Sequence, residues 1–195
     1  MRAKPPEWKG RTVVCIASGP SLTPEDCETV RLSGHPVVVT NTTFRLCPWA
    51  DVLYGFDANW WRVHIEEVRA SFKGRLICNS QLSARMGVET TNAESWFRGM
   101  GNSGVAAIAF AVGGGASKVV LLGYDCGLGP NKEKHWHGDH PKGMSNCASM
   151  AKWFYQFKQI SRYCNQQGAR VLNASRRTAL ECFETMALED ALRDR

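Results

Sequence analysis

Short apolar runs alternate with amphipathic stretches along most of the chain. Six of these runs are four to six residues long and rich in Val, Ile and Leu, which is typical of strands buried on both faces of a sheet. They lie at residues 12–17, 36–40, 51–56, 75–78, 117–122 and 169–172. We therefore predict a strand at each of these places.

Helices are predicted between the strands, and the first of them has the clearest start. Thr23 suits an N-cap, Pro24 the first helical position and Asp26 the third position of a capping box. The other helices are expected from helical spacing of apolar residues or from a run of small apolar residues, at 59–72, 103–112, 145–165 and 177–192. This alternation predicts an α/β, Rossmann-like fold with a mainly parallel sheet of about six strands and helices on both faces.

Length and composition favour one globular domain. The chain has 195 residues, of which 44% are hydrophobic and 22% charged, and a domain typically has roughly 100–200 residues. We expect an N-terminal tail at 1–10 and a single nucleotide-binding domain at 11–195. No apolar run approaches the ~20 residues of a membrane span, and the N-terminus lacks an apolar signal core, so we predict a cytoplasmic protein without a membrane span.

The net charge and the cysteine content indicate the charge of the ligand and the state of the thiols. The net charge of +6 favours an anionic ligand such as a nucleotide, a nucleic acid or a phosphorylated sugar. The eight cysteines are spread evenly, none forms a CxxC pair, and several lie in apolar runs where Cys acts as a small hydrophobe. We expect free thiols in a reducing compartment and no cysteine-based zinc site.

Polar residues follow the predicted strands where each one ends. Five of the six strands run into Asn or Asp, and the first runs into Ser-Gly; the five residues are Asn41, Asp57, Asn79, Asp125 and Asn173. Because ligands bind outside the carboxyl ends of strands in open parallel sheets, the set predicts a polar crevice. The alternative for any one residue is that Asn and Asp favour turns.

Two glycine-containing loops open predicted helices. Ser18-Gly19-Pro20-Ser21 follows the first strand, and Gly101-Asn102-Ser103-Gly104 opens the buried helix. Glycine permits close backbone approach, and a helix start offers free N–H groups to an anion. The first loop matches neither the GxGxxG nor the Walker pattern, so for it a nucleotide contact and a plain turn both remain open; two such helix starts in one fold favour an anion site.

The segment from His135 to His140 holds three of the five histidines. Its spacing also matches the HxHxDH pattern of metallo-β-lactamase-like hydrolases, which need further ligands downstream. No His follows position 140, and 55 residues remain after it, so we predict no stoichiometric zinc. A histidine titrates near neutral pH and can act as a general base; the alternative is a solvated polar loop.

Taken together, these segments resemble a known superfamily. CIASGPSL, TNTTF, GNSGVAAIAFAVGGGASKVVLLGYDC, HWHGDH and VLNAS are similar to two branches, the bacterial sialyltransferases of glycosyltransferase family 42 and the archaeal 6-hydroxymethyldihydropterin pyrophosphokinases. The resemblance covers roughly residues 12–185. It implies a Rossmann-like sheet that binds a nucleotide, without a metal-binding DxD motif in the transferase branch.

The resemblance also implies roles for individual residues. In the transferase branch, His135 would be the general base, with His140 close behind; Asp125 is the third candidate catalytic residue. The strand ends, the two loops and the resemblance together give these candidate nucleotide- or substrate-binding residues: Gly19, Pro20, Ser21, Asn41, Asp57, Asn79, Asn102, Ser103, Gly104 and Asn173.

The function expected first is glycosyl transfer from a nucleotide-activated sugar donor, with a histidine base and no cofactor. The acceptor is open between a glycan, a small molecule and a nucleic acid, and the sequence leaves the oligomeric state open. The first alternative is an ATP-dependent pyrophosphokinase, in which Asp57 and Asp125 would hold Mg²⁺. The second is a non-catalytic nucleotide-binding module.

Overall fold

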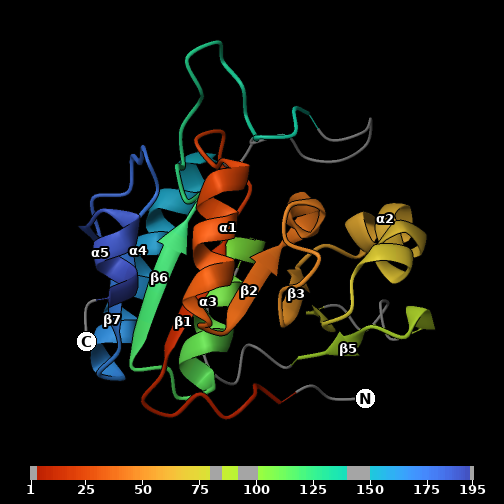
Figure 1. Cartoon of the computed structure of the whole chain (residues 1–195), viewed down its shortest axis with the longest axis horizontal. Coiled ribbons are helices and arrows are strands. Elements are labelled where there is room, and N and C mark those ends of the chain that lie inside the picture. Colours follow the sequence, from red (N-terminus) through yellow and green to blue (C-terminus); the bar gives the residue numbers. More distant parts are fainter. Residues whose placement is uncertain (1–3, 80–84, 92–100, 140–149, 194–195) are drawn as a thin grey trace.

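A parallel sheet forms the middle layer of the protein, as the computed structural model shows (Figure 1). The structure describes residues 4–79, 85–91, 101–139 and 150–193, and within them the sheet has eight strands. They are β1 (Thr12–Ile16), β2 (Val37–Thr40), β3 (Val52–Gly55), β4 (Arg75–Cys78), β5 (Glu89–Thr90), β6 (Lys118–Leu122), β7 (Arg170–Asn173) and β8 (Glu184–Thr185). Every neighbouring pair is parallel, which confirms the predicted α/β, Rossmann-like fold.

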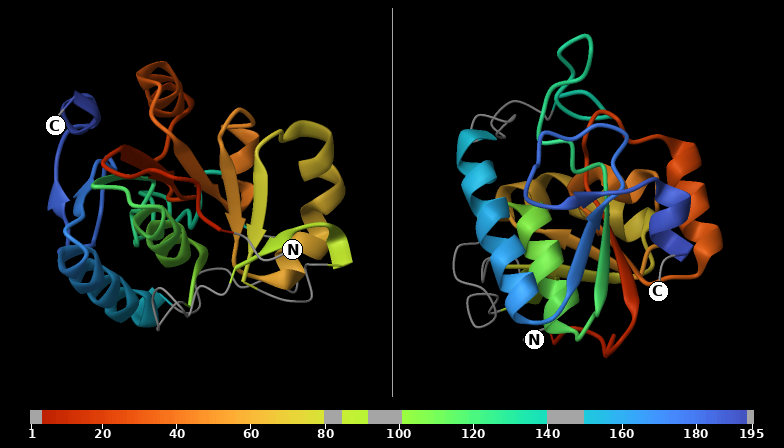
Figure 2. Two further views of the ribbon diagram at one scale, coloured as in Figure 1. Left: turned by 90° about the horizontal axis from the view of Figure 1, so that it is seen from below. Right: turned by 90° about the vertical axis from the view of Figure 1, so that its left-hand side faces the viewer.

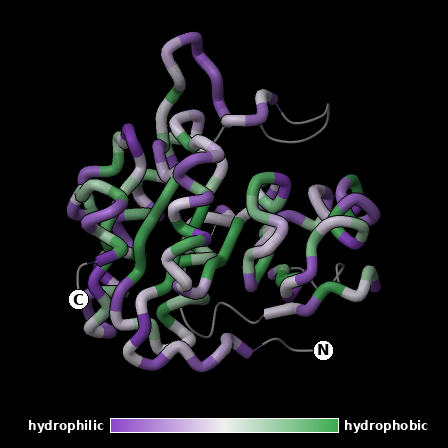
Figure 3. Tube along the Cα trace, viewed as in Figure 1, coloured by the Kyte–Doolittle hydropathy of each residue, from purple (hydrophilic) through white to green (hydrophobic). Residues whose placement is uncertain are grey.

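Helices cover both faces of the sheet (Figure 2). They are α1 (Pro24–Ser33), the 3₁₀ helix η1 (Asn41–Arg45), α2 (Ala58–Ser71), α3 (Ser103–Gly113), α4 (Met150–Gln166) and α5 (Leu188–Arg193). Helices α3 and α4 share one hydrophobic cluster with alternate strand residues such as Val13 and Cys15. The other helices share a second cluster with Val14 and Ile16, so the central strands β1 and β2 bury side chains on both faces and are almost entirely apolar (Figure 3).

The sheet has two strands more than the six that were predicted. Both extra strands, β5 and β8, are two-residue strands at the sheet's edges. Each is tied to its inner neighbour by an ion pair, Arg75–Glu89 at 2.7 Å and Arg170–Glu184 at 3.0 Å. A hydrophobic pattern cannot detect such strands because pairing and charge, rather than apolar burial, define them.

The predicted helix at 177–192 is wrong over most of its length, since helical structure in that range begins at Leu188. Leu180 and Phe183 pack into the cluster on the α3 face, whereas Leu188 and Ala191 pack into the cluster on the opposite face. Between them the chain forms β8 at the edge of the sheet. The apolar residues that resembled one helical stripe therefore serve two different faces.

The start of α1 agrees with the sequence analysis. Thr23 is the N-cap, its side chain accepts a hydrogen bond from Asp26 N, and the Asp26 carboxylate accepts one from the Thr23 backbone. Pro24 occupies the first helical position. The capping box thus fixes where the chain leaves the loop after β1 and enters the helix.

The N-terminal segment that was expected to be a tail reaches the core at Trp8. This side chain is 4% exposed and packs edge-on against Phe110 of α3, with ring centroids 6.0 Å apart. Its backbone N–H donates to Gly114 O at 2.7 Å. Trp8 is therefore part of the core. Removing its large apolar ring from water lowers the free energy of the folded state.

The side on which successive strands are added to the sheet changes between β1 and β6. The strand order is β5-β4-β3-β2-β1-β6-β7-β8, so β2 to β5 are added on one side of β1 and β6 to β8 on the other. In open parallel sheets, the loops on either side of such a switch point diverge and leave a crevice at the carboxyl ends of the strands. The topology therefore places a crevice beyond β1 and its neighbours β2 and β6.

Candidate functional site

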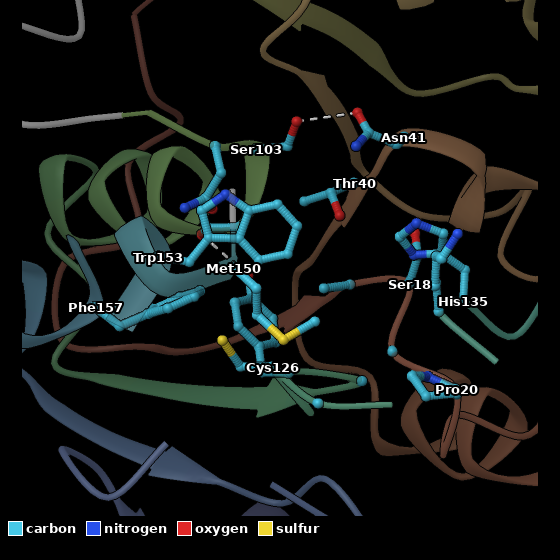
Figure 4. A pocket seen from close by; sticks show the side chains of 18 residues that line it. Ser18, Pro20, Thr40, Asn41, Ser103, Cys126, His135, Met150, Trp153 and Phe157 are labelled. Carbon is cyan, nitrogen blue, oxygen red and sulfur yellow. Dashed lines mark hydrogen bonds between the residues drawn. The ribbon is translucent and has the colours of Figure 1, made fainter. Parts of the chain in front are cut away.

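A cavity of about 130 Å³ lies beyond the carboxyl ends of β1, β2 and β6 (Figure 4). Its walls come from the loop after β1, the end of β2, the start of α3, the loop after β6 and the first turns of α4. The lining residues are Ala17, Ser18, Gly19, Pro20, Thr40, Asn41, Asn102, Ser103, Gly104, Gly123, Tyr124, Cys126, Gly127, Lys134, His135, Met150, Trp153 and Phe157. The cavity thus occupies the switch point of the sheet.

The cavity brings together seven of the thirteen candidate residues from the sequence. These are Gly19, Pro20, Asn41, Asn102, Ser103, Gly104 and His135. Five others are described but do not line it: Ser21, Asp57, Asn79, Asp125 and Asn173. His140 lies outside the described residues.

One polar wall of the cavity joins the end of β2 to the start of α3. Ser103 Oγ donates to Asn41 Oδ1 at 3.0 Å and accepts from Phe56 N at 3.0 Å (Figure 4). Asn41 has a φ of +47°, in the left-handed region that asparagine tolerates better than most residues. Thr40, beside it, is 2% exposed. The wall therefore presents hydroxyl and amide groups whose positions are fixed by hydrogen bonds.

The start of α3 lies at the cavity wall. Asn102 is the N-cap: its Oδ1 accepts from Val105 N, and its Nδ2 donates to Gln156 Oε1 of α4, both at 2.9 Å. The preceding first-turn N–H groups belong to Ser103 and Gly104, which line the cavity. First-turn N–H groups have no acceptor within their own helix and carry the positive end of the helix dipole.

The loop after β1 is ordered by the carboxylate of Asp125. Ser21 donates to it twice, from its backbone N to Oδ2 at 2.8 Å and from its hydroxyl to Oδ1 at 2.9 Å. A Cβ at Gly19 would overlap Asp125 Oδ1, so glycine is required for this close approach. Burial raises the pKa of Asp125, and the bonds from Ser21 oppose the rise. Asp125 therefore supports the loop from outside the cavity.

A carboxylate side chain of the protein itself caps the start of α1. Asp26 completes the capping box and accepts two hydrogen bonds from Arg176, both at 2.8 Å. Arg176 and Asp26 therefore form an internal ion pair. With Asp26 and Asp125 near this helix start, a bound anion is favoured at α3 rather than at α1.

The loop after β6 rises above the carboxyl ends of the strands (Figure 1) and brings His135 to the cavity. Trp136 N donates to Ser18 O at 3.2 Å, and the rings of His135 and His137 stack with centroids 5.1 Å apart. Burial lowers the pKa of His135, while a hydrogen bond with the Ser18 backbone opposes this. The imidazole is therefore neutral at pH 7, the form that accepts a proton.

Three strand-end residues serve the fold instead of the cavity. Asp57 is the N-cap of α2 and accepts from Asn59 N at 2.8 Å. Asn79 accepts from the Tyr54 and Thr91 hydroxyls. Asn173 Nδ2 donates to Thr178 Oγ1, and its Oδ1 accepts from Ser175 N, both at 3.0 Å. For these three positions, the turn-forming explanation of strand-end Asn and Asp fits the contacts.

Sequence reasoning missed the apolar wall that α4 contributes. Met150, Trp153 and Phe157 lie at helical spacing and line the cavity. Phe157 is also a core residue, at 5% exposed. Trp153 is only partly buried, although it packs against the core. The i, i+3, i+7 spacing of three large apolar residues was the signal available, and a purely structural helix has the same signal.

The side chains of the described residues also bear on metal and thiol chemistry. Within them, no group of three or more His, Cys, Asp and Glu side chains comes together as a metal site would require. The seven cysteines they include are all free thiols, which confirms that prediction for these seven. In the same part of the chain, no helix combines the length and apolar character needed to cross a membrane.

No protein-family model and no curated protein matches this sequence.

Proposed function

We propose that the protein is a glycosyltransferase that binds a nucleotide-activated sugar in this cavity and uses His135 as its general base. The observation that carries the proposal is the pairing of two groups around one cavity: His135, with its lowered pKa, and the start of α3. A base and an anion site on one cavity suit transfer from a phosphate leaving group. The resemblance to the family 42 sialyltransferases supports the same activity.

The residues have distinct tasks in the proposed reaction. An acceptor hydroxyl attacks the anomeric carbon, its proton passes to the neutral imidazole of His135, and the bond from that carbon to the phosphate oxygen breaks. A hydroxyl is a poor nucleophile, and a positioned base contributes about 10²–10⁴-fold. The electron pair leaves on the nucleotide phosphate, which the N–H groups at the start of α3 stabilise. Lys134 also lines the cavity, and its charge is partly balanced by an ion pair with Asp139 at 3.2 Å.

The pyrophosphokinase alternative is less favoured by the contacts of its two candidate carboxylates. Phosphoryl transfer from ATP needs oxygen ligands for Mg²⁺ beside the phosphates. Asp57 caps α2 and is exposed, and both oxygens of Asp125 accept from Ser21. Neither residue lines the cavity. A non-catalytic module would keep nucleotide binding but release no nucleotide from a donor.

The first experiment is a thermal-shift screen of CMP, UMP, GDP, ADP and ATP, followed by an assay of the matching sugar nucleotides. A ligand at 100 times its Kd stabilises the native state by about 2.7 kcal/mol, which raises the Tm of a chain of this size by about 5–11 °C. We expect at least one nucleotide to do so, and its sugar nucleotide to release free nucleotide with acceptor. The proposal fails if none of the nucleotides stabilises the protein.

The second experiment tests the base with His135→Ala. We expect kcat to fall by about 10²–10⁴-fold while the nucleotide Kd stays within about twofold, because the proposed base acts in the chemical step. The control is His35→Gln, since His35 lies before β2 and bonds Leu192 O at 3.0 Å, away from the cavity lining. Full activity in His135→Ala removes this histidine from the mechanism.

The pH profile gives an independent reading of the same group. Burial lowers the pKa of His135 below 6.5, so its neutral form persists to lower pH than that of an exposed histidine. We expect the kcat/KM of the wild type, which reports the pKa of the free enzyme, to fall only below pH 6.5, as the imidazole becomes protonated. The residual activity of His135→Ala should lack this acidic limb.

A further inference from the structure

The two sides of the cavity differ in chemistry. The polar side consists of Thr40, Asn41, Ser103 and the first turn of α3, with His135 beside Ser18 (Figure 4). The apolar wall consists of Met150, Trp153 and Phe157 of α4. In Figure 4 the labelled side chains of α4 lie on one side of the view, and His135 and Pro20 lie on the other. A ligand that fills the cavity meets both kinds of surface.

The apolar wall is held firmly at its base and is open at Trp153. Phe157 packs edge-on against Tyr124 at 5.9 Å and against Phe183 at 6.2 Å, measured between ring centroids. Trp153, one helical turn earlier, packs against the same core cluster but is only partly buried. A partly exposed indole on a rigid support, beside the flexible thioether of Met150, offers a flat apolar surface to a ligand.

The chemical order of a nucleotide sugar decides which of its parts meets this wall. Its parts follow each other as base, ribose, phosphate and sugar. The phosphate is favoured at the start of α3, and the transferred sugar must lie within reach of the proposed base, His135. The remaining end of the molecule is the nucleobase, and the remaining surface of the cavity is the α4 wall.

We propose that the nucleobase of the donor stacks on the indole of Trp153, between the side chains of Met150 and Phe157. This inference rests on the proposed function and adds to it the direction in which the donor lies. A stacked base is recognised by its π-face, which all bases share. The wall therefore supplies affinity for a planar heteroaromatic ring, and the edge contacts that would choose among bases come from other residues.

The test compares the wild type with Trp153→Ala and Trp153→Phe, using calorimetry with two probes. One probe is whichever nucleoside monophosphate stabilises the wild type, and the other is ribose 5-phosphate, which lacks the base. Loss of one stacking contact should weaken binding of the monophosphate by about 5- to 150-fold. Binding of ribose 5-phosphate should change by less than twofold, and Trp153→Phe should retain most of the affinity for the monophosphate.

The matched control is Tyr155→Ala, which removes another aromatic ring from the same helix. Tyr155 is 65% exposed and does not line the cavity, so its removal should leave both affinities unchanged. Thermal melts of all variants show whether each one is folded. Trp153→Phe keeps a ring in place and carries the test if Trp153→Ala does not fold.

The possible failures are distinguishable. If the monophosphate binds the wild type and Trp153→Ala equally well, the stacking proposal is wrong and the proposed function stands. If Trp153→Ala weakens both probes equally, the wall does not hold the base. If it weakens only a methyl glycoside added as a third probe, the wall holds the sugar and the donor lies in the opposite direction. If no nucleotide binds the wild type, the proposed function itself fails.

Discussion

Replacing Asp125 tests whether this residue supports the loop after β1 or takes part in the reaction. The carboxylate is 4% exposed and accepts two hydrogen bonds from Ser21. A hydrogen bond to a charged group contributes about 1.5–3 kcal/mol, and a buried donor left without a partner costs about 1–3 kcal/mol. The cost of burying the carboxylate offsets part of this gain. We therefore expect Asp125→Ala to lower the free energy of unfolding by about 2–4 kcal/mol.

Asp125→Asn is the discriminating companion. Its side-chain oxygen can accept from the Ser21 N–H, and its amide can donate to the Ser21 hydroxyl, so both contacts survive without the charge. We expect it to lose about 1 kcal/mol or less. In thermal melts, Asp125→Ala should lower the Tm by about 4–16 °C for a chain of this size. Urea titrations should rank the wild type, Asp125→Asn and Asp125→Ala in the same order of stability.

The contribution of Asp125 to stability depends on pH with a definite sign. Burial raises the folded-state pKa of Asp125 above its unfolded value of 3.8, so just above pH 3.8 the native state binds more protons than the unfolded state. The contribution of this carboxyl to stability therefore falls as the pH rises through its folded-state pKa. The stability of the wild type relative to Asp125→Asn should decrease as the pH rises from 3.8 to the raised folded-state pKa of Asp125.

One result would refute a structural role for Asp125. If Asp125→Ala and Asp125→Asn both melt with the wild type and both lose turnover, the carboxylate acts in the reaction or holds a metal ion. That outcome favours the pyrophosphokinase alternative, in which the carboxylates matter more than the histidines. The reasoning stands if Asp125→Asn keeps both stability and turnover while Asp125→Ala loses stability.

A buried histidine and a cavity cysteine give two more predictions. Burial lowers the pKa of His64 below its unfolded value of 6.5, so its contribution to stability is present above pH 6.5 and is lost as the pH falls through the lowered pKa. Urea titrations of the wild type and His64→Phe should therefore diverge in pH dependence below pH 6.5. Cys126 lines the cavity, so a bound nucleotide should slow its labelling by a thiol reagent in a Cys147→Ser, Cys182→Ser background, whereas an unchanged labelling rate would place the ligand elsewhere.

The central strands could be predicted from sequence because they are buried on both faces. Residues such as Val14 and Val120, which face each other across β1 and β6, are fully buried, so these strands are continuous apolar runs. The edge strands could not be found in this way. Glu89 and Glu184 are held by backbone pairing and by ion pairs with Arg75 and Arg170, and none of these contacts leaves a local pattern.

The strand-end residues could be recognised as a set, but the sequence could not separate those that line the cavity from those that do not. Asn41 and Asn173 are the same residue type at the same place on a strand, yet one lines the cavity and the other bonds its own loop. The difference is the position of the strand in the sheet. β2 is paired with β1, whereas β7 is paired with β6 and lies two strands from β1, and strand order depends on long-range pairing.

The shape of the cavity depends on contacts between α3 and α4 that neither segment shows alone. A Cβ at Gly101 would overlap the amide of Gln156, and a Cβ at Gly104 would lie 3.0 Å from the Tyr124 ring. The glycines of this loop therefore allow close packing of neighbouring side chains. From the sequence, they were expected only to let a ligand approach the backbone. The hydrogen bond from Asn102 to Gln156 joins residues 54 positions apart. Because that bond links the start of α3 to the helix that carries the apolar wall, it helps to position the two halves of the proposed donor site, together with the hydrophobic cluster that α3 and α4 share.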